Sequence, residues 1–135
     1  MSILQQINIK AIGYGSIILT LAYLLLTYSL NYIANTSSSM PGILMWLNFL
    51  VLFCFILCGY ITAVLAKKSG ILNGMVLGVI SPFLVLLAMF LLFGSSVMLK
   101  SYESNWYYWF LMGLVTCGFG GLVWDLKKKF INVKP

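Results

Sequence analysis

Residues 59–78 read GYITAVLAKKSGILNGMVLG and contain two apolar segments that a short basic turn separates. The turn Lys67-Lys68-Ser69-Gly70 combines two charges with turn-forming residues, so one helix is expected to end before it and another to follow it. Apolar sequence continues on both sides, over about residues 43–66 and about residues 74–93. Each run is long enough to cross a hydrocarbon core of about 30 Å as an α-helix. The segment therefore predicts a hairpin of two membrane-spanning helices.

Two more apolar runs flank this hairpin, at about residues 11–33 and about residues 106–124, and none of the four runs contains Asp, Glu, Lys, Arg or His. Of the 135 residues, 62% are hydrophobic and 7% are charged, whereas a soluble domain carries about 25% charged residues. This composition excludes a soluble globular protein, a disordered chain and a secreted disulfide scaffold. We expect an all-α membrane protein, a four-transmembrane-helix bundle that forms a single integral membrane domain over residues 1–135.

The lysines predict the orientation of the bundle, because Lys and Arg collect in cytoplasmic loops and tails. Four spans place seven lysines on one side, and only Lys100, partly offset by Glu103, lies on the other. The seven are Lys10, Lys67, Lys68, Lys127, Lys128, Lys129 and Lys134. Both termini are therefore expected in the cytoplasm (N-in/C-in), with residues 125–135 as a basic tail.

The helices are expected to associate through small and polar residues, because burial of leucine does not drive helix association in lipid. Such residues recur at spacings of three and four, which places them on one face of a helix. The predicted helix-packing residues are Gly13, Ser16, Thr20, Thr27 and Asn31 in the first run, Asn48 and Gly59 in the second, Gly74 and Gly78 in the third, and Gly113, Cys117 and Gly121 in the fourth. The polar face of the first run is alternatively a substrate path, and packing is the favoured interpretation.

Pro82 lies inside the third run and is expected to kink that helix, because proline removes one backbone hydrogen bond. The hydroxyl of Ser81 is expected to satisfy the carbonyl that the proline frees.

Catalysis has little support in the sequence, which contains no His or Arg and only two acids, Glu103 and Asp125. The two acids are expected on opposite sides of the membrane, so they cannot form a catalytic pair. Asp125 is expected to pair with Lys128 or Lys129 at helical spacing. We therefore expect a protein that is not an enzyme and has no cofactor. The apolar runs also lack the carboxylate or histidine that proton-coupled transporters usually carry within the membrane.

Two features suggest contacts with a ligand or a partner. Cys54 and Cys58 lie one helical turn apart and, with a methionine, could bind a soft metal such as Cu(I); their use as small apolar residues is the favoured interpretation. Lys127, Lys128 and Lys129 are expected to contact anionic lipids or a partner protein. Nucleic-acid binding is not expected, because the lysines lie between apolar runs and form no basic surface in water.

Residues 59–78 also resemble the centre of certain small bacterial four-helix membrane proteins. The shared pattern is Gly59-Tyr60-Ile61-Thr62-Ala63, then the basic turn, then Asn73-Gly74 and Gly78. Cys58 stands where a second glycine is common in those proteins. The resemblance implies a bacterial cytoplasmic membrane and a four-helix fold, and it carries no activity.

Three hypotheses for the function follow. The first is a non-catalytic membrane protein that acts through helix association, as a small subunit or accessory factor of a membrane complex or as a homo-oligomer. The second is a pore former or small transporter, such as a holin-like protein or a small-solute channel, and the third is a metal-handling protein. The expected partners are membrane lipids and either another membrane protein or a second copy of the chain.

Overall fold

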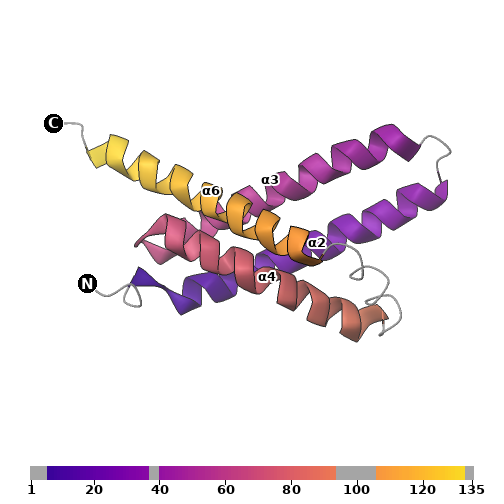
Figure 1. The fold of residues 1–135 in the computed structure, drawn as a ribbon, viewed down its shortest axis with the longest axis horizontal. Coiled ribbons are helices and arrows are strands. Elements are labelled where there is room, and N and C mark those ends of the chain that lie inside the picture. The colour runs from indigo at the N-terminus through magenta and orange to yellow at the C-terminus, as the bar shows by residue number, and fades with distance from the viewer. Residues whose placement is uncertain (1–5, 37–39, 94–105, 133–135) are drawn as a thin grey trace.

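The computed structural model describes residues 6–36, 40–93 and 106–132, and this part of the chain consists almost entirely of four long α-helices (Figure 1). The helices are α2 (Ile9–Thr36), α3 (Met40–Ala66), α4 (Gly70–Phe93) and α6 (Trp106–Asn132). Each contains a segment that is long and apolar enough to cross a membrane. The prediction of an all-helical protein with four helices able to span a membrane is therefore confirmed for the described residues.

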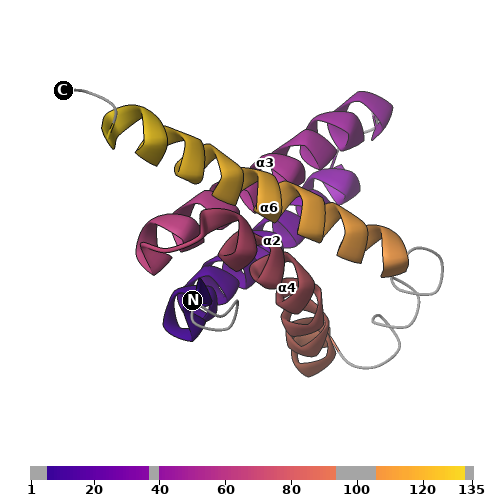
Figure 2. The ribbon, with the colours of Figure 1, turned by 60° about the vertical axis from the view of Figure 1, so that its left-hand side comes forward.

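Consecutive helices run in opposite directions, so the start of α2, the turn between α3 and α4, and the end of α6 lie at the same end of the bundle (Figure 1). α6 crosses over α3 and α4, and α2 packs against α3 and α4 (Figure 2). Toward the opposite end the α2–α3 pair and α4 diverge.

All four helices are longer than the apolar runs that predict them. α4 begins at Gly70, one turn before its run, and α6 continues past its run through three lysines to Asn132. Hydropathy marks where a helix enters lipid, whereas helical hydrogen bonding continues wherever residue preferences allow it. Lysine is a good helix former and its charge is favourable at the C-terminal end of a helix, so most of the basic tail is helical.

Local capping explains where α2 begins and α3 ends. The side-chain Oδ1 of Asn8 accepts the backbone N–H of Ala11 at 3.2 Å, and its carbonyl accepts the N–H of Ile12 at 3.0 Å, which makes Asn8 the N-cap of α2. Lys67 follows the last residue of α3 with a φ of 57°. This left-handed conformation terminates many helices and is usually adopted by glycine.

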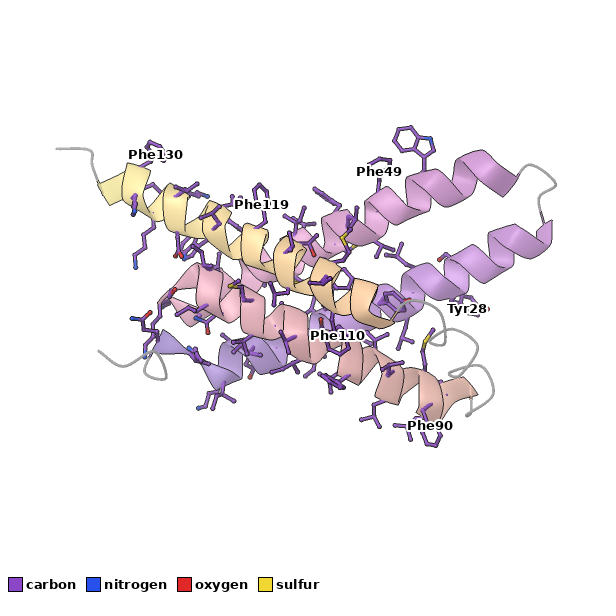
Figure 3. The ribbon with its side chains drawn as sticks, in the orientation of Figure 1. Tyr28, Phe49, Phe90, Phe110, Phe119 and Phe130 are labelled. Carbon is purple, nitrogen blue, oxygen red and sulfur yellow. The ribbon has the colours of Figure 1, made fainter. Side chains whose placement is uncertain are left out.

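The buried core is small and lies where the four helices cross. Leu19, Phe55, Cys58, Leu77 and Cys117 form its central cluster. The outside is covered with large apolar side chains, and Figure 3 shows Tyr28, Phe49 and Phe90 on the outside of the bundle. A soluble protein rarely exposes so much contiguous apolar surface, so this exterior fits a lipid environment.

Candidate functional site

Asn73 in the first turn of α4 is fully buried and joins the chain segment before α2 to the turn between α3 and α4. Its Oδ1 accepts the backbone N–H of Asn8 at 2.8 Å. Its Nδ2 donates to the carbonyls of Gln6 at 3.0 Å and Ser69 at 2.6 Å. Both amide hydrogens and the amide oxygen are therefore satisfied by backbone groups, so this buried polar side chain has a structural role.

Asp125 on α6 binds the N-terminal end of α4. Its Oδ1 accepts the backbone N–H of Gly70 at 2.9 Å, and its Oδ2 accepts that of Ile71 at 3.1 Å. Lys128 or Lys129 was the expected partner of Asp125. In the structure the carboxylate accepts two backbone N–H groups of another helix instead. The contact is favourable because the N-terminal end of a helix carries free N–H groups and partial positive charge.

These two connections bring six lysines to one end of the bundle. Asn73 and Asp125 hold the start of α2, the α3–α4 turn and the end of α6 together, and the lysines lie on those segments. They are Lys10, Lys67, Lys68, Lys127, Lys128 and Lys129. We call this end of the molecule the basic end. Lys134, Lys100 and Glu103 lie outside the described residues.

α4 and α6 touch backbone to backbone along a row of small residues. A Cβ added to Gly74 would overlap the carbonyl of Cys117, and one added to Gly78 would overlap the carbonyl of Gly113. From the other side, a Cβ on Gly113 would lie 2.7 Å from the Gly78 oxygen, and one on Gly121 would overlap the Gly70 carbonyl. Such contacts need glycine because the obstructing atoms are backbone and cannot move aside.

α3 makes a similar contact with α6, which also involves the backbone of Cys117. A Cβ on Gly59 would lie 2.7 Å from the Cα of Cys117, and one on Gly120 would lie 2.8 Å from the backbone nitrogen of Tyr60. Cys117 is fully buried and therefore lies between α3 and α4. The structure thus brings Gly59, Gly74 and Cys117 together at the centre of the bundle.

On α2 the packing residues differ from those that the sequence predicted. Gly13 is exposed, and a Cβ there would meet no atom within 4 Å among the described residues, so its assignment as a packing residue was wrong. Gly15 makes the contact in its place, because a Cβ at this position would overlap the hydroxyl of Thr62 and lie 3.4 Å from Leu77. Ser16, next to it, is buried as predicted for a face directed at the bundle.

Two serines in the core have hydroxyls without a hydrogen-bond partner in the described part of the chain. They are Ser16 on α2 and Ser81 on α4, and both are buried. The expectation that Ser81 satisfies the carbonyl freed by Pro82 was therefore wrong. α4 continues through the buried Pro82 as one helix, and the kink remains a prediction. The hydroxyl of Thr20, by contrast, donates to its own helix at the carbonyl of Ser16, 2.8 Å away.

The side chains of Thr27, Asn31 and Asn48 lie outside the described part of the structure. Their roles in packing remain predictions.

The cysteines lie within the helices as free thiols. Cys58 and Cys117 are buried in the central cluster, and Cys54 is partly exposed. The described residues contain no group of three or more His, Cys, Asp or Glu side chains that could hold a metal ion. Cys58 and Cys117 act in this structure as small apolar residues of the core.

At the basic end, Lys127 lies against an aromatic pair. Its Nζ donates to the hydroxyl of Tyr60 at 3.2 Å and lies 5.9 Å from the centre of the Tyr60 ring. The rings of Tyr60 and Trp124 meet edge to face, 5.9 Å apart, at an interplanar angle of 86°. The Trp124 Nε1 is buried without a hydrogen-bond partner among the described residues.

The roles of Asn73, Gly15 and Tyr60 were not predicted from the sequence. Asn73 is a weak signal in a sequence, because two of its three partners are backbone groups of residues more than 60 positions away. Tyr60 lies near the end of an apolar run, where an aromatic residue also serves as a general membrane anchor. Gly13 and Gly15 are two residues apart, and the angle at which the helices cross decides which of them faces a neighbouring helix.

No protein-family model, curated protein or solved structure matches this chain. We therefore infer the function from the sequence and from the geometry of the molecule. That geometry consists of a core closed by backbone contacts, a basic end held together by Asn73 and Asp125, and an apolar exterior.

Proposed function

We propose that this chain is a non-catalytic multi-pass protein of a bacterial cytoplasmic membrane, with both termini in the cytoplasm. It acts through helix association, either as a small subunit or accessory factor of a membrane complex or as a homo-oligomer. Its orientation follows from the basic end, since lysines collect on the cytoplasmic side.

The observation that carries this proposal is the closed interior. At the crossing of α3, α4 and α6 the backbones touch at Gly59, Gly74 and Gly78, which leaves no room for side-chain chemistry there. Asp125 is the one acid among the described residues, and both of its oxygens bind the end of α4. The surface left for an activity is then the apolar exterior, where a partner helix would bind.

Photo-cross-linking in native membranes tests association directly. A benzoylphenylalanine in place of the exposed Phe49 or Phe90 is expected to give discrete products heavier than the monomer. The matched control is the same probe at Phe110, whose ring packs on Phe83 at 4.8 Å and should react within the chain. Monomer alone from every exposed position, together with a strictly monomeric chain in mild detergent, would contradict the proposal.

Reporter fusions after Pro135 test the orientation. A fluorescent protein is expected to fold and fluoresce there, whereas alkaline phosphatase is expected to stay inactive, because the end of α6 faces the cytoplasm. An active phosphatase would reverse the assignment of sides.

The unpartnered hydroxyls of Ser16 and Ser81 favour a second candidate, a pore former or small transporter. A buried polar group without a partner is costly unless water or a solute satisfies it. Flux of ions or small solutes from liposomes that contain the purified protein, reduced in a Ser16→Ala and Ser81→Ala double variant, would support this function. Tight liposomes under all conditions would exclude it.

A further inference from the structure

The basic end carries an excess of positive charge that the described residues do not neutralise. Six lysines face one acid, Asp125, whose oxygens accept the N–H groups of Gly70 and Ile71, so the described residues of this end keep a net positive charge. An anion is therefore the kind of partner that this end attracts. Lys127 is held in a defined position against the ring of Tyr60.

Lys127 and Tyr60 present hydrogen-bond donors side by side. The ammonium group has three N–H donors, and the hydroxyl of Tyr60 accepts one of them. That leaves two N–H donors on Lys127 and the O–H donor of Tyr60 for an acceptor outside the protein. Because Trp124 packs against the edge of Tyr60, the tyrosine ring is held in place before any ligand arrives.

An exposed apolar stripe lies on α6 beside this pair of residues. It consists of Phe119, Val123 and Leu126, which recur at helical spacing, are all exposed and precede Lys127 along the helix. Figure 3 shows Phe119 projecting from the outside of α6. A charged donor group at one end of an apolar stripe matches a molecule that has an anionic head and a hydrocarbon chain.

We propose that Lys127 and Tyr60 bind the phosphate of one anionic phospholipid, whose acyl chain lies along the stripe Phe119, Val123 and Leu126. Placing that lipid in the inner leaflet rests on the orientation proposed above. Binding itself follows from the donors and the stripe. Lys127 therefore has a different role from Lys128 and Lys129, which supply only general positive charge.

Native mass spectrometry of the purified chain in mild detergent tests this site without reference to orientation or to a partner protein. Phosphatidylglycerol is expected to bind more tightly than phosphatidylcholine with the same acyl chains. Lys127→Ala should weaken phosphatidylglycerol binding about fivefold, the change that corresponds to roughly 1 kcal/mol for one lysine at an anionic headgroup. Lys129→Ala, which removes the same charge from the same helix, should weaken it by less than about twofold.

Two further variants separate the head from the chain. Tyr60→Phe keeps the ring and should lower the affinity because it removes the hydroxyl, and Phe119→Ala should weaken long-chain lipids more than short-chain ones. Glycerol phosphate serves as the soluble headgroup and should compete poorly. Equal effects of Lys127→Ala and Lys129→Ala, or no preference for the anionic lipid, would overturn the proposal. Full competition by glycerol phosphate would overturn the role of the stripe.

Discussion

Lys67 ends α3 in a left-handed conformation that costs a residue with a Cβ roughly 1–2 kcal/mol. Its N–H still bonds to the carbonyl of Ala63 at 3.2 Å, so the backbone geometry serves to end the helix. The side chain is exposed, and its charge belongs to the basic end. The sequence has a lysine at this position, although a left-handed backbone conformation is usually adopted by glycine.

Lys67→Gly is therefore expected to raise the stability of the folded protein, by about 0.5–1 kcal/mol after the added freedom of the unfolded chain is included. Thermal unfolding in detergent, followed by circular dichroism, measures the change. Lys68→Gly is the matched control, since it removes the same charge from a residue without a positive φ. If both variants shift the midpoint equally, backbone strain at Lys67 is not the cause.

Asn73 is the residue on which the basic end depends most. Asn73→Leu fills a similar volume but leaves the carbonyls of Gln6 and Ser69 and the N–H of Asn8 without this partner. We expect a loss of about 2–4 kcal/mol, because several polar groups become unsatisfied at once. Equilibrium unfolding by a denaturing detergent gives the value.

Thr20→Val is a suitable comparison for Asn73→Leu, because the Thr20 hydroxyl bonds only within its own helix. Its expected cost is below about 1 kcal/mol. A small effect of Asn73→Leu, similar to that of Thr20→Val, would show that the segment before α2 is held by other contacts.

At the scale of the helices, the contact between α4 and α6 depends on the absence of side chains. Gly78→Ala would place a methyl group on the carbonyl of Gly113 and is expected to cost about 1–3 kcal/mol through forced separation of the backbones. Gly13→Ala, on an exposed face of α2, should be neutral or stabilise by up to about 1 kcal/mol, because alanine is the better helix former. Thermal unfolding measures both changes. A larger loss of stability for Gly13→Ala than for Gly78→Ala would contradict this view.

The helices themselves were predictable from the sequence, because uninterrupted apolar runs of this length have few alternatives to membrane spans. The contacts between the helices were less predictable. Gly74 and Gly78 are one turn apart and lie against α6, whereas Gly13 in a similar stripe faces away and Gly15 packs instead. A shift of two residues turns a side chain by about 200° around a helix, and the sequence does not state the angle at which two helices cross. Asn73 and Asp125 bind backbone groups of distant segments, which no residue pattern encodes.

For the whole molecule, the arrangement combines a basic end joined by hydrogen bonds, a middle closed by glycine contacts and an opposite end where the α2–α3 pair and α4 diverge (Figure 2). Hydrogen bonds of Asn73, Asp125 and Lys127 join different segments of the chain at the basic end. Toward the diverging end most of the described exposed side chains are large and apolar, so lipid or, under the proposed function, a partner helix is the natural neighbour there.

The three native thiols report on how tightly the middle of the molecule is closed. Cys117 lies between Gly59 and Gly74 and is fully buried, whereas Cys54 is partly exposed. In variants that retain a single cysteine, a small maleimide in detergent should react with Cys117 at least about tenfold more slowly than with Cys54, because Cys117 reacts only when the bundle opens locally. Adding Gly78→Ala should speed the reaction of Cys117 and leave that of Cys54 unchanged, because the methyl group separates α4 from α6. Equal rates for the two thiols would mean that the contacts of α6 with α3 and α4 do not persist in solution, and the closed interior would then no longer argue against a path through the bundle.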